Sequence, residues 1–411
     1  PVAAEESKVF GGLKALKVLH ITHLYPRPYD RLLGIAMHKQ IKALEAQGCM
    51  QKVLSPTPWA PFPIKYLSRK WKSYSQVPTR DVVEGVEVFY PRYLVFPRAI
   101  LLASSGIRMY SGIRQLVRKI KENFPFDLIH AHMALPDGYA GMLISKIYQK
   151  PLVVTFQATD LDITANRNKR CLAALEKVFS YADKVIAPSP RLAKSLVSKF
   201  GVNPVVIGYG IDISDIHTGE SALSSAYAGR RVLLSVSRLI RTKGVELNIR
   251  AVKRLVGKFE NILYVVVGSG PERQALEQLT RSLDIAEHVR FIGQVPHEKA
   301  MEYMAACEIF TLPSWQETFG LVYIEAMAHA KPVVAVQGQG VDGIVFHGKT
   351  GLLVKPRDVD SLVEALDFLL SHPEEARAMG ERARKLVLEN YTWEKNAEKT
   401  IAIYKEVLNA G

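Results

Sequence analysis

Residues 231–256 read RVLLSVSRLIRTKGVELNIRAVKRLV, and this stretch contains the unit that decides the fold. An apolar run, 231–237, is followed by a polar loop and then by a helical pattern that opens at Gly244. Nearly continuous Val, Ile and Leu between helices is typical of parallel strands that are covered on both faces. The same alternation continues along the chain and predicts strands at 17–22, 127–132, 151–156, 184–189, 204–208, 231–237, 262–268, 289–293, 309–313, 332–336 and 351–354.

The length of the chain predicts two domains. Its 411 residues exceed what one core usually supports, and its hydrophobic content of 48% is that of an ordinary globular protein. The segment 208–229 is rich in Gly, Ser and Asp and interrupts the alternation, so it is the predicted linker. We therefore predict two Rossmann-like α/β domains, each a doubly wound parallel sheet, at residues 1–207 and 230–390. Ligands bind at the carboxyl ends of such strands, so two facing domains should bind them in the cleft between them.

Composition favours a cytoplasmic protein. No apolar run approaches the ~18 residues of a membrane span. The first residues lack the basic start and apolar stretch of a secretory signal, and they predict a loose tail. The three cysteines, Cys49, Cys171 and Cys307, lack the paired spacing of a disulfide framework or a zinc site. A reducing compartment fits this pattern.

The positive charge is confined to the first half of the chain. Residues 1–210 hold 30 Lys and Arg against 14 Asp and Glu, whereas residues 211–411 hold 24 against 26. Two segments, 63–74 and 91–122, mix these cations with aromatic and aliphatic residues, which is typical of an element in a membrane interface. A solvated basic helix over a core is the alternative. Such a surface implies an anionic partner, and no nucleic-acid-binding module accompanies the charge.

Two cations follow the run 231–237 directly. Arg238 and Lys243 lie in the loop, and Gly244 opens the next helix. A forked guanidinium, an ammonium and the free N–H groups of a helix start together form a site for a diphosphate. An ordinary solvated turn is the alternative.

Two carboxylates flank a later helix start. The stretch ETFGLVYIE places Glu317 in a loop and Glu325 about two turns later, in a helix predicted at 321–330. Carboxylates accept hydrogen bonds from sugar hydroxyls, and helix N–H groups near Gly320 attract anions. A solvated pair of acids is the alternative. Two hydroxyl-binding groups on either side of a diphosphate indicate a nucleotide sugar.

Five motifs of the second half resemble the retaining glycosyltransferases of family 4, which have the GT-B fold. They are SVSRLIRTKG, VVVGSGPER, VRFIGQV, LPSWQETFGLVYIEAMAHAKPVVA and GKTGLLVKP, in this order from residue 231 onward. The resemblance implies that the last helix, within 391–411, crosses back to the first domain. It implies that Glu317 contacts the donor sugar and that Glu325 holds the ribose. Arg238 and Lys243 would bind the diphosphate, and the other expected donor-binding residues here are Phe319, Gly320 and Leu321.

The first half resembles the same family. In THLYPRPYDRLLGIAMHKQIKALEAQG, the resemblance implies that the backbone of Gly34 approaches the donor. In DLIHAHMALPDGYA it places His132 beside the donor sugar, with a core or capping role as the alternative. In VVTFQATD it retains Asp160, while Gln157 and Ala158 depart from the usual His-Gly-x-Asp. IGYGID also departs from the usual Pro-Asn-Gly, and these departures leave the acceptor open.

Together these features predict a glycosyltransferase that moves a sugar from a UDP- or GDP-sugar to a glycan, and the resemblance alone implies that it retains the anomeric configuration. The expected acceptor is a lipid-linked or other glycan of polysaccharide or cell-envelope synthesis, reached from the inner face of a membrane by peripheral attachment. No metal or other cofactor is expected. Of two Asp-x-Asp sequences, DLD at 160–162 and DVD at 358–360, the second precedes a helical pattern and predicts a helix cap.

Four alternatives belong to other functional classes. A dinucleotide oxidoreductase would need a third glycine in VVVGSGPER, where Gly268 and Gly270 are followed by Arg273. A glycan phosphorylase would need a pyridoxal lysine that the sequence does not identify. A nucleotide-sugar epimerase would lack the spacing of Glu317 and Glu325. A module that binds a sugar nucleotide or a membrane without turnover is the fourth.

Overall fold

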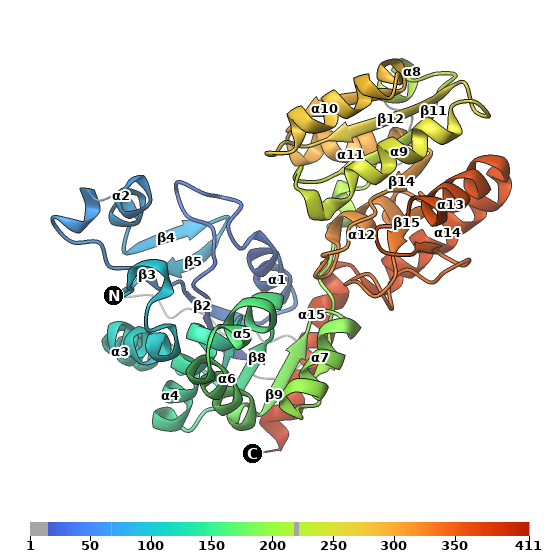
Figure 1. Ribbon diagram of the computed structural model, residues 1–411. Helices are drawn as coiled ribbons and strands as arrows, with labels where there is room; N and C mark the ends of the chain where they lie inside the picture. Colours follow the sequence, from blue (N-terminus) through green and yellow to red (C-terminus); the bar gives the residue numbers. More distant parts are fainter. Residues whose placement is uncertain (1–14, 67, 218–221, 411) are drawn as a thin grey trace. The chain divides into compact units, whose positions relative to one another are not determined.

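The structure is a computed structural model that describes residues 15–66, 68–217 and 222–410 (Figure 1). Its contacts divide the chain into two units. The first comprises Pro1–Pro188, Leu192–Gly208 and Asn396–Gly411, and the second comprises Ser189–Arg191 and Tyr209–Lys395. The second unit thus contains most of the segment predicted as the linker. The predicted loose tail falls on residues 1–14, outside the described residues.

The first unit is built on an eight-stranded sheet with the order β10-β9-β8-β7-β1-β2-β5-β4. Its strand pairs are parallel except for the edge pair β4 and β5. The strands are β1 (Lys17–Ile21), β2 (Met50–Leu54), β4 (Arg80–Val83), β5 (Val86–Phe89), β7 (Leu128–Ala131), β8 (Leu152–Thr155), β9 (Lys184–Ala187) and β10 (Val205–Val206). A separate short parallel pair joins β3 (Thr57–Pro58) and β6 (Arg92–Tyr93).

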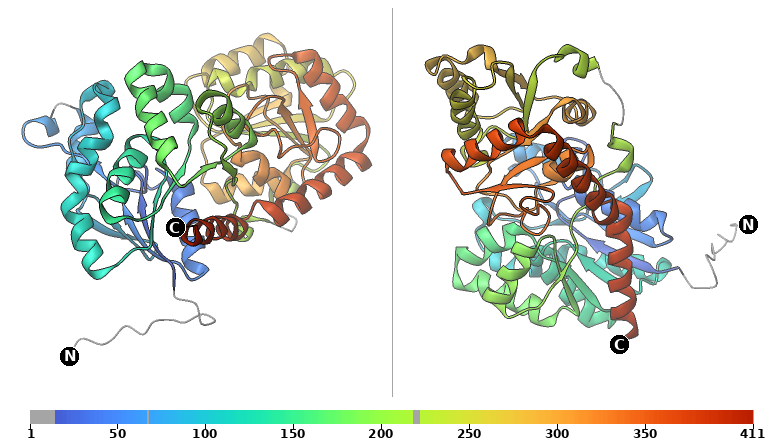
Figure 2. Two further views of the ribbon diagram at one scale, coloured as in Figure 1. Left: turned by 90° about the horizontal axis from the view of Figure 1, so that it is seen from below. Right: turned by 90° about the vertical axis from the view of Figure 1, so that its right-hand side faces the viewer.

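Helices cover both faces of this sheet. In β8, Leu152 and Val154 contribute to one core and Val153 to another, as the alternation of side chains along a strand requires. The second core includes Tyr404 of the C-terminal helix, drawn red in Figures 1 and 2, which confirms that this helix crosses back to the first unit. The helices are α1 (Ile35–Ala46), α2 (Arg69–Gln76), α3 (Ser105–Asn123), α4 (Tyr139–Tyr148), α5 (Ala165–Arg167), α6 (Lys169–Tyr181), α7 (Pro190–Phe200) and α15 (Trp393–Asn409).

The second unit is built on a six-stranded parallel sheet with the order β13-β12-β11-β14-β15-β16. Its strands are β11 (Arg231–Val236), β12 (Ile262–Val267), β13 (Val289–Gly293), β14 (Ile309–Thr311), β15 (Val333–Val336) and β16 (Gly351–Val354). Its helices are α8 (Ala222–Ala226), α9 (Val245–Leu255), α10 (Arg273–Ser282), α11 (His297–Ala306), α12 (Leu321–Ala328), α13 (Val359–Ser371) and α14 (Pro373–Asn390).

This sheet is also buried on both faces. Leu263, Val265 and Val267 of β12 pack into the core with α11, α12 and α14, while the intervening residues pack with α9, α10 and α13. The predicted doubly wound sheets are therefore confirmed in both units. Asp358 caps α13 by accepting a hydrogen bond from Ser361 N at 3.0 Å, as the DVD sequence predicted. In the described part of the chain, no helix is both long and apolar enough to cross a membrane.

Each sheet reverses its strand order at one point. In the second unit β12 and β13 lie on one side of β11, and β14 to β16 lie on the other. In the first unit β1 is flanked by β2 and β7 in the same way. Open α/β sheets bind ligands outside the carboxyl ends of the strands at such a reversal. The loops that matter therefore follow β11 and β14 in one unit and β1 and β7 in the other.

Candidate functional site

In the second unit, the loops after β11 and β14 touch each other. Gly244, which begins α9, has a φ of 71°, and a Cβ there would lie 2.3 Å from the carbonyl oxygen of Pro313. Both the conformation and this contact require glycine. Trp315 N also donates to Thr242 O at 3.0 Å. The loop that carries the predicted cations is thus held against the loop that carries Glu317.

Lys243 and Glu317 form an ion pair across these two loops. Lys243 Nζ lies 2.6 Å from Glu317 Oε2, and the two side chains are only 20% and 12% exposed. The main chain of Glu317 is fixed, because Gly340 N donates to its carbonyl at 3.0 Å and its own N–H donates to Gln339 Oε1 at 3.3 Å. A cation and a carboxylate are therefore held side by side at the reversal of the sheet.

Two helix starts lie in the same loops. The N-cap residues of α9 and α12 are Gly244 and Gly320, both in the left-handed conformation, and no described side chain caps either helix. Their first N–H groups lack intrahelical partners and attract anions. Tyr323 steadies α12 because its buried hydroxyl donates to Leu312 O at 2.5 Å. Burial, with the charge of Glu317, raises the pKa of Tyr323 well above its ordinary value, so the hydroxyl keeps its proton.

The other residues predicted in this unit differ in their exposure. Arg238 is exposed after β11, and Glu325 is half-buried on α12. Phe319 is buried, with its ring 5.3 Å from that of Tyr209, and Leu321 is half-buried. At Phe319 the main chain, not the packed ring, is the part that a ligand could contact.

The glycines of VVVGSGPER serve packing. A Cβ at Gly268 would lie 1.9 Å from Ser237 O, and one at Gly270 would lie 2.2 Å from Leu239 O. These two glycines bring the loop after β12 against the loop after β11. That contact accounts for both of them without a bound dinucleotide.

In the first unit, three histidines stack beneath the reversal of the sheet. His132, just after β7, lies with its Nε2 3.0 Å from Nδ1 of His20, and its ring centroid is 4.2 Å from that of His130. All three side chains are buried. Burial lowers the pKa of His132 to about 3, and it lowers the pKa of His20 and His130 well below the ordinary value. The predicted catalytic His132 is therefore a neutral imidazole.

Both ring nitrogens of His130 have hydrogen-bond partners within the protein. Nδ1 of His130 lies 2.6 Å from Tyr404 OH, and Nε2 lies 2.8 Å from Thr155 Oγ1. The three histidines offer nitrogens within 4.8 Å of one another, a spacing that could hold a metal ion. Hydrogen bonds to protein groups account for both nitrogens of His130, and the predicted lack of a metal stays a prediction.

Asp160 joins two loops of the first unit. It has no exposed surface, and its carboxylate accepts hydrogen bonds from Ala134 N at 3.1 Å, Leu135 N at 3.3 Å and Gln157 N at 3.1 Å. Burial raises the pKa of Asp160 to about 7 against the opposing effect of these N–H groups. Gln157 Nε2 also donates to His132 O at 3.2 Å, so Gln157 links the predicted residues Asp160 and His132. This geometry gives Asp160 a positioning role, and its predicted part in donor binding stays a prediction.

Gly34 begins α1 with a φ of 66°, and a Cβ there would lie 2.1 Å from Leu24 O. Glycine is therefore required by the chain itself, and its approach to a donor stays a prediction. The loop after β1 also holds a pair that sequence reasoning missed. His23 Nδ1 lies 2.9 Å from Asp137 Oδ1, whose carboxylate is fully buried. The quoted DLIHAHMALPDGYA and THLYP contain both partners, but only the fold places them together.

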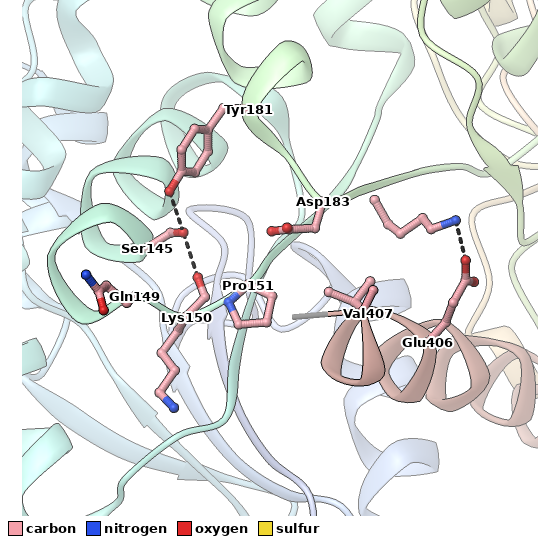
Figure 3. A pocket seen from close by; sticks show the side chains of 10 residues that line it. Ser145, Gln149, Lys150, Pro151, Tyr181, Asp183, Glu406 and Val407 are labelled. Atoms are coloured by element: carbon pink, nitrogen blue, oxygen red, sulfur yellow. Dashed lines mark hydrogen bonds and ion pairs between the residues drawn. The ribbon is translucent and has the colours of Figure 1, made fainter.

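A different pocket, of about 420 Å³, lies at the opposite, amino ends of β8 and β9 (Figure 3). Ser145 Oγ donates to Lys150 O at 2.6 Å and lies 3.0 Å from Tyr181 OH, and Lys184 pairs with Glu406 at 2.6 Å. The polar side chains of Ser145, Tyr181, Lys184 and Glu406 are thus paired, and the pocket contains none of the predicted site residues.

Known proteins share this sequence and this architecture. Residues 34–215 match the family model described as Glycosyltransferase Family 4, and residues 221–386 match the model described as Glycosyl transferases group 1. The D-inositol 3-phosphate glycosyltransferase of Kribbella flavida is 30% identical over 70% of this chain and 72% of that protein. TuaC of Bacillus subtilis, a glycosyltransferase assigned to teichuronic acid biosynthesis, is 28% identical over 85% of this chain and 88% of that protein.

The fold has solved counterparts. HepE of Anabaena, solved in complex with UDP, superposes with a TM-score of 0.73 at 19% identity, over 95% of this chain and 100% of that chain. Two Rossmann-like parallel sheets, two matching family models and a relative at 30% identity lead to one assignment. The chain belongs to the group 1 glycosyltransferases and has the GT-B fold.

Proposed function

We propose that this glycosyltransferase takes its sugar from a nucleotide-diphosphate sugar and transfers it to a glycan hydroxyl with retention of configuration. The observation that carries the proposal is the Lys243–Glu317 pair, 2.6 Å apart, beside two helix starts that no described side chain caps. Ammonium and N–H groups suit a diphosphate, and a carboxylate suits sugar hydroxyls. HepE, of the same fold, was solved with UDP, which supports a nucleotide donor.

In this account the donor changes the partner of Lys243. In this structure Lys243 and Glu317 neutralise each other. A bound diphosphate would draw the ammonium to its oxygens and free the carboxylate to accept hydrogen bonds from the donor sugar. Arg238, exposed after the same strand, would add a second cation, and Glu325 on α12 would hold the ribose.

The transfer would break the bond between the anomeric carbon and the β-phosphate oxygen, and the electron pair would leave with the nucleoside diphosphate. The acceptor oxygen would bond to the anomeric carbon from the same face, and its proton would pass to the departing phosphate oxygen. Lys243 and the helix N–H groups would stabilise the negative charge that develops on that oxygen. Neutral His132 would add no charge to a donor sugar placed beside it.

Nucleotide binding tests this proposal through thermal unfolding. We expect one of UDP, GDP and ADP, with its sugars, to raise the unfolding temperature by several degrees, since a ligand at about 100 times its Kd adds roughly 2.7 kcal/mol. Glu325→Ala should reduce that rise. Glu364→Ala, which removes an exposed carboxylate of α13, is the matched control and should not. No response of the wild type to any nucleotide would contradict the proposal.

We further propose that the acceptor lies at a membrane surface and that the first unit attaches to it peripherally. The region before and within α2 exposes Phe62 (78%), Tyr66 (67%) and Trp59 (52%) among its cations. Apolar rings beside Lys and Arg suit the interface of an anionic bilayer. The acceptor would then be a lipid-linked glycan of polysaccharide or cell-envelope synthesis.

Vesicle binding tests this attachment. Replacing Lys65, Arg69 and Lys72 by Gln should weaken binding to vesicles of anionic phospholipid, measured by sedimentation, by about 100-fold, since each of the three cations contributes about 1 kcal/mol near such a surface. The matched control replaces exposed cations of the second unit by Gln, namely Lys253, Arg281 and Arg377. Equal binding of both variants would overturn peripheral attachment through this region.

A further inference from the structure

A cavity of about 570 Å³ in the first unit is lined by four cations: Lys70, Arg98, Arg108 and Arg167. No Asp or Glu occurs among the described residues that line it. It extends to His23, which follows β1, and to Pro136, which follows β7, so it reaches the reversal of the sheet. We propose that this cavity, the cationic pocket, binds a phosphate group of the acceptor. This inference rests on the proposed function and names the chemistry of its acceptor.

A buried hydroxyl of the pocket has no partner. Ser105, the first residue of the long helix α3, lines the pocket and is 5% exposed, and its Oγ makes no hydrogen bond to any described residue. A buried polar atom without a partner is rare in folded proteins and calls for a ligand or a water. No described side chain caps α3 either. A phosphate placed here could accept from both the hydroxyl and the first N–H groups of the helix.

The arginines of the pocket are fixed in place by uncharged groups. Arg108 donates through Nε to Leu94 O at 3.0 Å, through Nη1 to Ser104 Oγ at 2.7 Å and through Nη2 to Leu101 O at 3.0 Å. Burial lowers the pKa of Arg108 from its ordinary value, and none of these partners neutralises its charge. Arg167 donates to Arg98 O at 2.7 Å. The charges of Arg108 and Arg167 are thus held in position by neutral groups and left available to an anion.

An adjoining pocket of about 280 Å³ shares His23, Lys70 and Tyr74 with the cationic pocket and contains Arg27. Arg27 is 4% exposed, donates to His23 O at 2.8 Å and to Tyr29 OH at 3.0 Å, and has an unpartnered Nε. A buried guanidinium is costly without a counter-charge. Asp30 lines this smaller pocket, but its carboxylate accepts from Leu32 N and Leu33 N. Arg27 therefore adds a buried cation beside the proposed phosphate.

The lining of the cationic pocket also includes apolar side chains. They are Trp71, Val95, Phe96 and Ile100. Several cations of the segments 63–74 and 91–122, which the sequence placed in a membrane interface, therefore line a pocket. A phosphate beside an apolar group, in a sugar phosphate or a lipid phosphate, matches this lining.

Calorimetry with matched probes tests the pocket. The probes are glucose 1-phosphate and decyl phosphate, with glucose and decyl glucoside as their phosphate-free counterparts. The titrations use a Lys243→Met background, so that the proposed diphosphate site does not capture the phosphate. The pocket variants are Ser105→Ala and the double variant Arg98→Gln with Arg167→Gln. The control is Arg114→Gln with Lys119→Gln, which removes equal charge from the exposed side of α3.

We expect the phosphate probes to bind and their phosphate-free counterparts not to bind. The double variant should weaken binding by tenfold or more, because it removes two charged hydrogen-bond donors. Ser105→Ala should weaken it about threefold, and the control less than twofold. Tighter binding of decyl phosphate would identify a lipid phosphate as the source, and tighter binding of glucose 1-phosphate a sugar phosphate. Either outcome supports the pocket.

Equal losses in the pocket and control variants would overturn the inference, because diffuse surface charge would then explain the binding. Equal binding of phosphate-free probes would overturn it as well. Nucleotide binding by the protein with Lys243 intact separates this inference from the proposed function. Nucleotide binding without phosphate-probe binding refutes the pocket alone, and the reverse refutes the nucleotide donor alone.

Discussion

Lys243→Met lowers kcat/KM for sugar transfer by about 100-fold or more, because loss of one preorganised charge that stabilises a transition state costs about 2.7–4 kcal/mol. The ammonium lies 2.6 Å from Glu317 at the reversal of the sheet, where the diphosphate would leave. Release of nucleoside diphosphate from UDP- and GDP-sugars, with and without glycan acceptors, measures the loss. Lys253→Met, an exposed lysine of the same helix α9, is the matched control and should retain full activity.

A second variant separates chemistry from folding. Lys243→Met leaves the mostly buried Glu317 carboxylate without its cation, which can destabilise the loop. The double variant with Glu317→Gln removes that unpaired charge and should restore the unfolding temperature without restoring turnover. Full activity in Lys243→Met would contradict the assigned role. A wild-type protein that binds the nucleotide but releases no product with any acceptor, or by slow hydrolysis, would favour the non-catalytic alternative.

Lowering the pH from about 7.5 to about 5 destabilises the first unit. His20, His130 and His132 are neutral when folded, because burial lowers the pKa of each, to about 3 for His132. In the unfolded chain each takes up a proton near pH 6.5. The unfolded state then binds more protons, so the free energy of unfolding falls as the pH drops below about 6.5, by at most about 1.4 kcal/mol per pH unit for each histidine.

Asp160 acts in the opposite direction. Its pKa is raised to about 7 in the folded state, so its contribution to stability grows as the pH falls from about 7 towards 4. The proton that folded Asp160 takes up offsets only one of the three protons that the histidines take up on unfolding. The net effect of acid is therefore a loss of stability. The loss of stability can be measured for the first unit alone by urea unfolding that is monitored through hydrogen exchange in peptides of β1 and β7.

His20→Gln provides the internal comparison. It removes one of the three histidines whose protonation Asp160 partly offsets, so the net difference falls from about two protons to about one, and the loss of stability with falling pH should become about half as steep. His347→Gln, which removes an exposed histidine of the second unit, should leave that slope unchanged. A first unit equally stable at about pH 5 and pH 7.5 would contradict neutral burial of this cluster.

Most of the fold could be predicted because buried parallel strands are continuous apolar runs. All strands of the second unit coincide with predicted runs to within two residues. In the first unit, β2, β4 and β5 were missed. Each has exposed or half-buried positions along it, since β4 and β5 form the antiparallel edge of the sheet and β2 begins exposed. A search for continuous apolar runs cannot find strands of this kind.

Site residues could be predicted from the sequence only where they belong to a recognisable motif. Lys243 and Glu317 were named from separate motifs, 74 residues apart, and the adjacency of β11 and β14 places them in contact. His20 was missed, although it lies opposite His130 in the register of β1 and β7. The three N–H partners of Asp160 come from two loops, so its positioning role depends on tertiary structure that no local pattern contains.

The most direct test of the nucleotide-sugar account is a crystal structure of this protein with the nucleoside diphosphate that stabilises it most. The account predicts the diphosphate within hydrogen-bond distance of Lys243 Nζ and of the N–H groups that begin α12, with the ribose hydroxyls at Glu325. Lys243 should then have moved away from Glu317, from which it lies 2.6 Å in the present structure. A nucleotide bound elsewhere, or one that leaves the Lys243–Glu317 pair intact, would contradict the account.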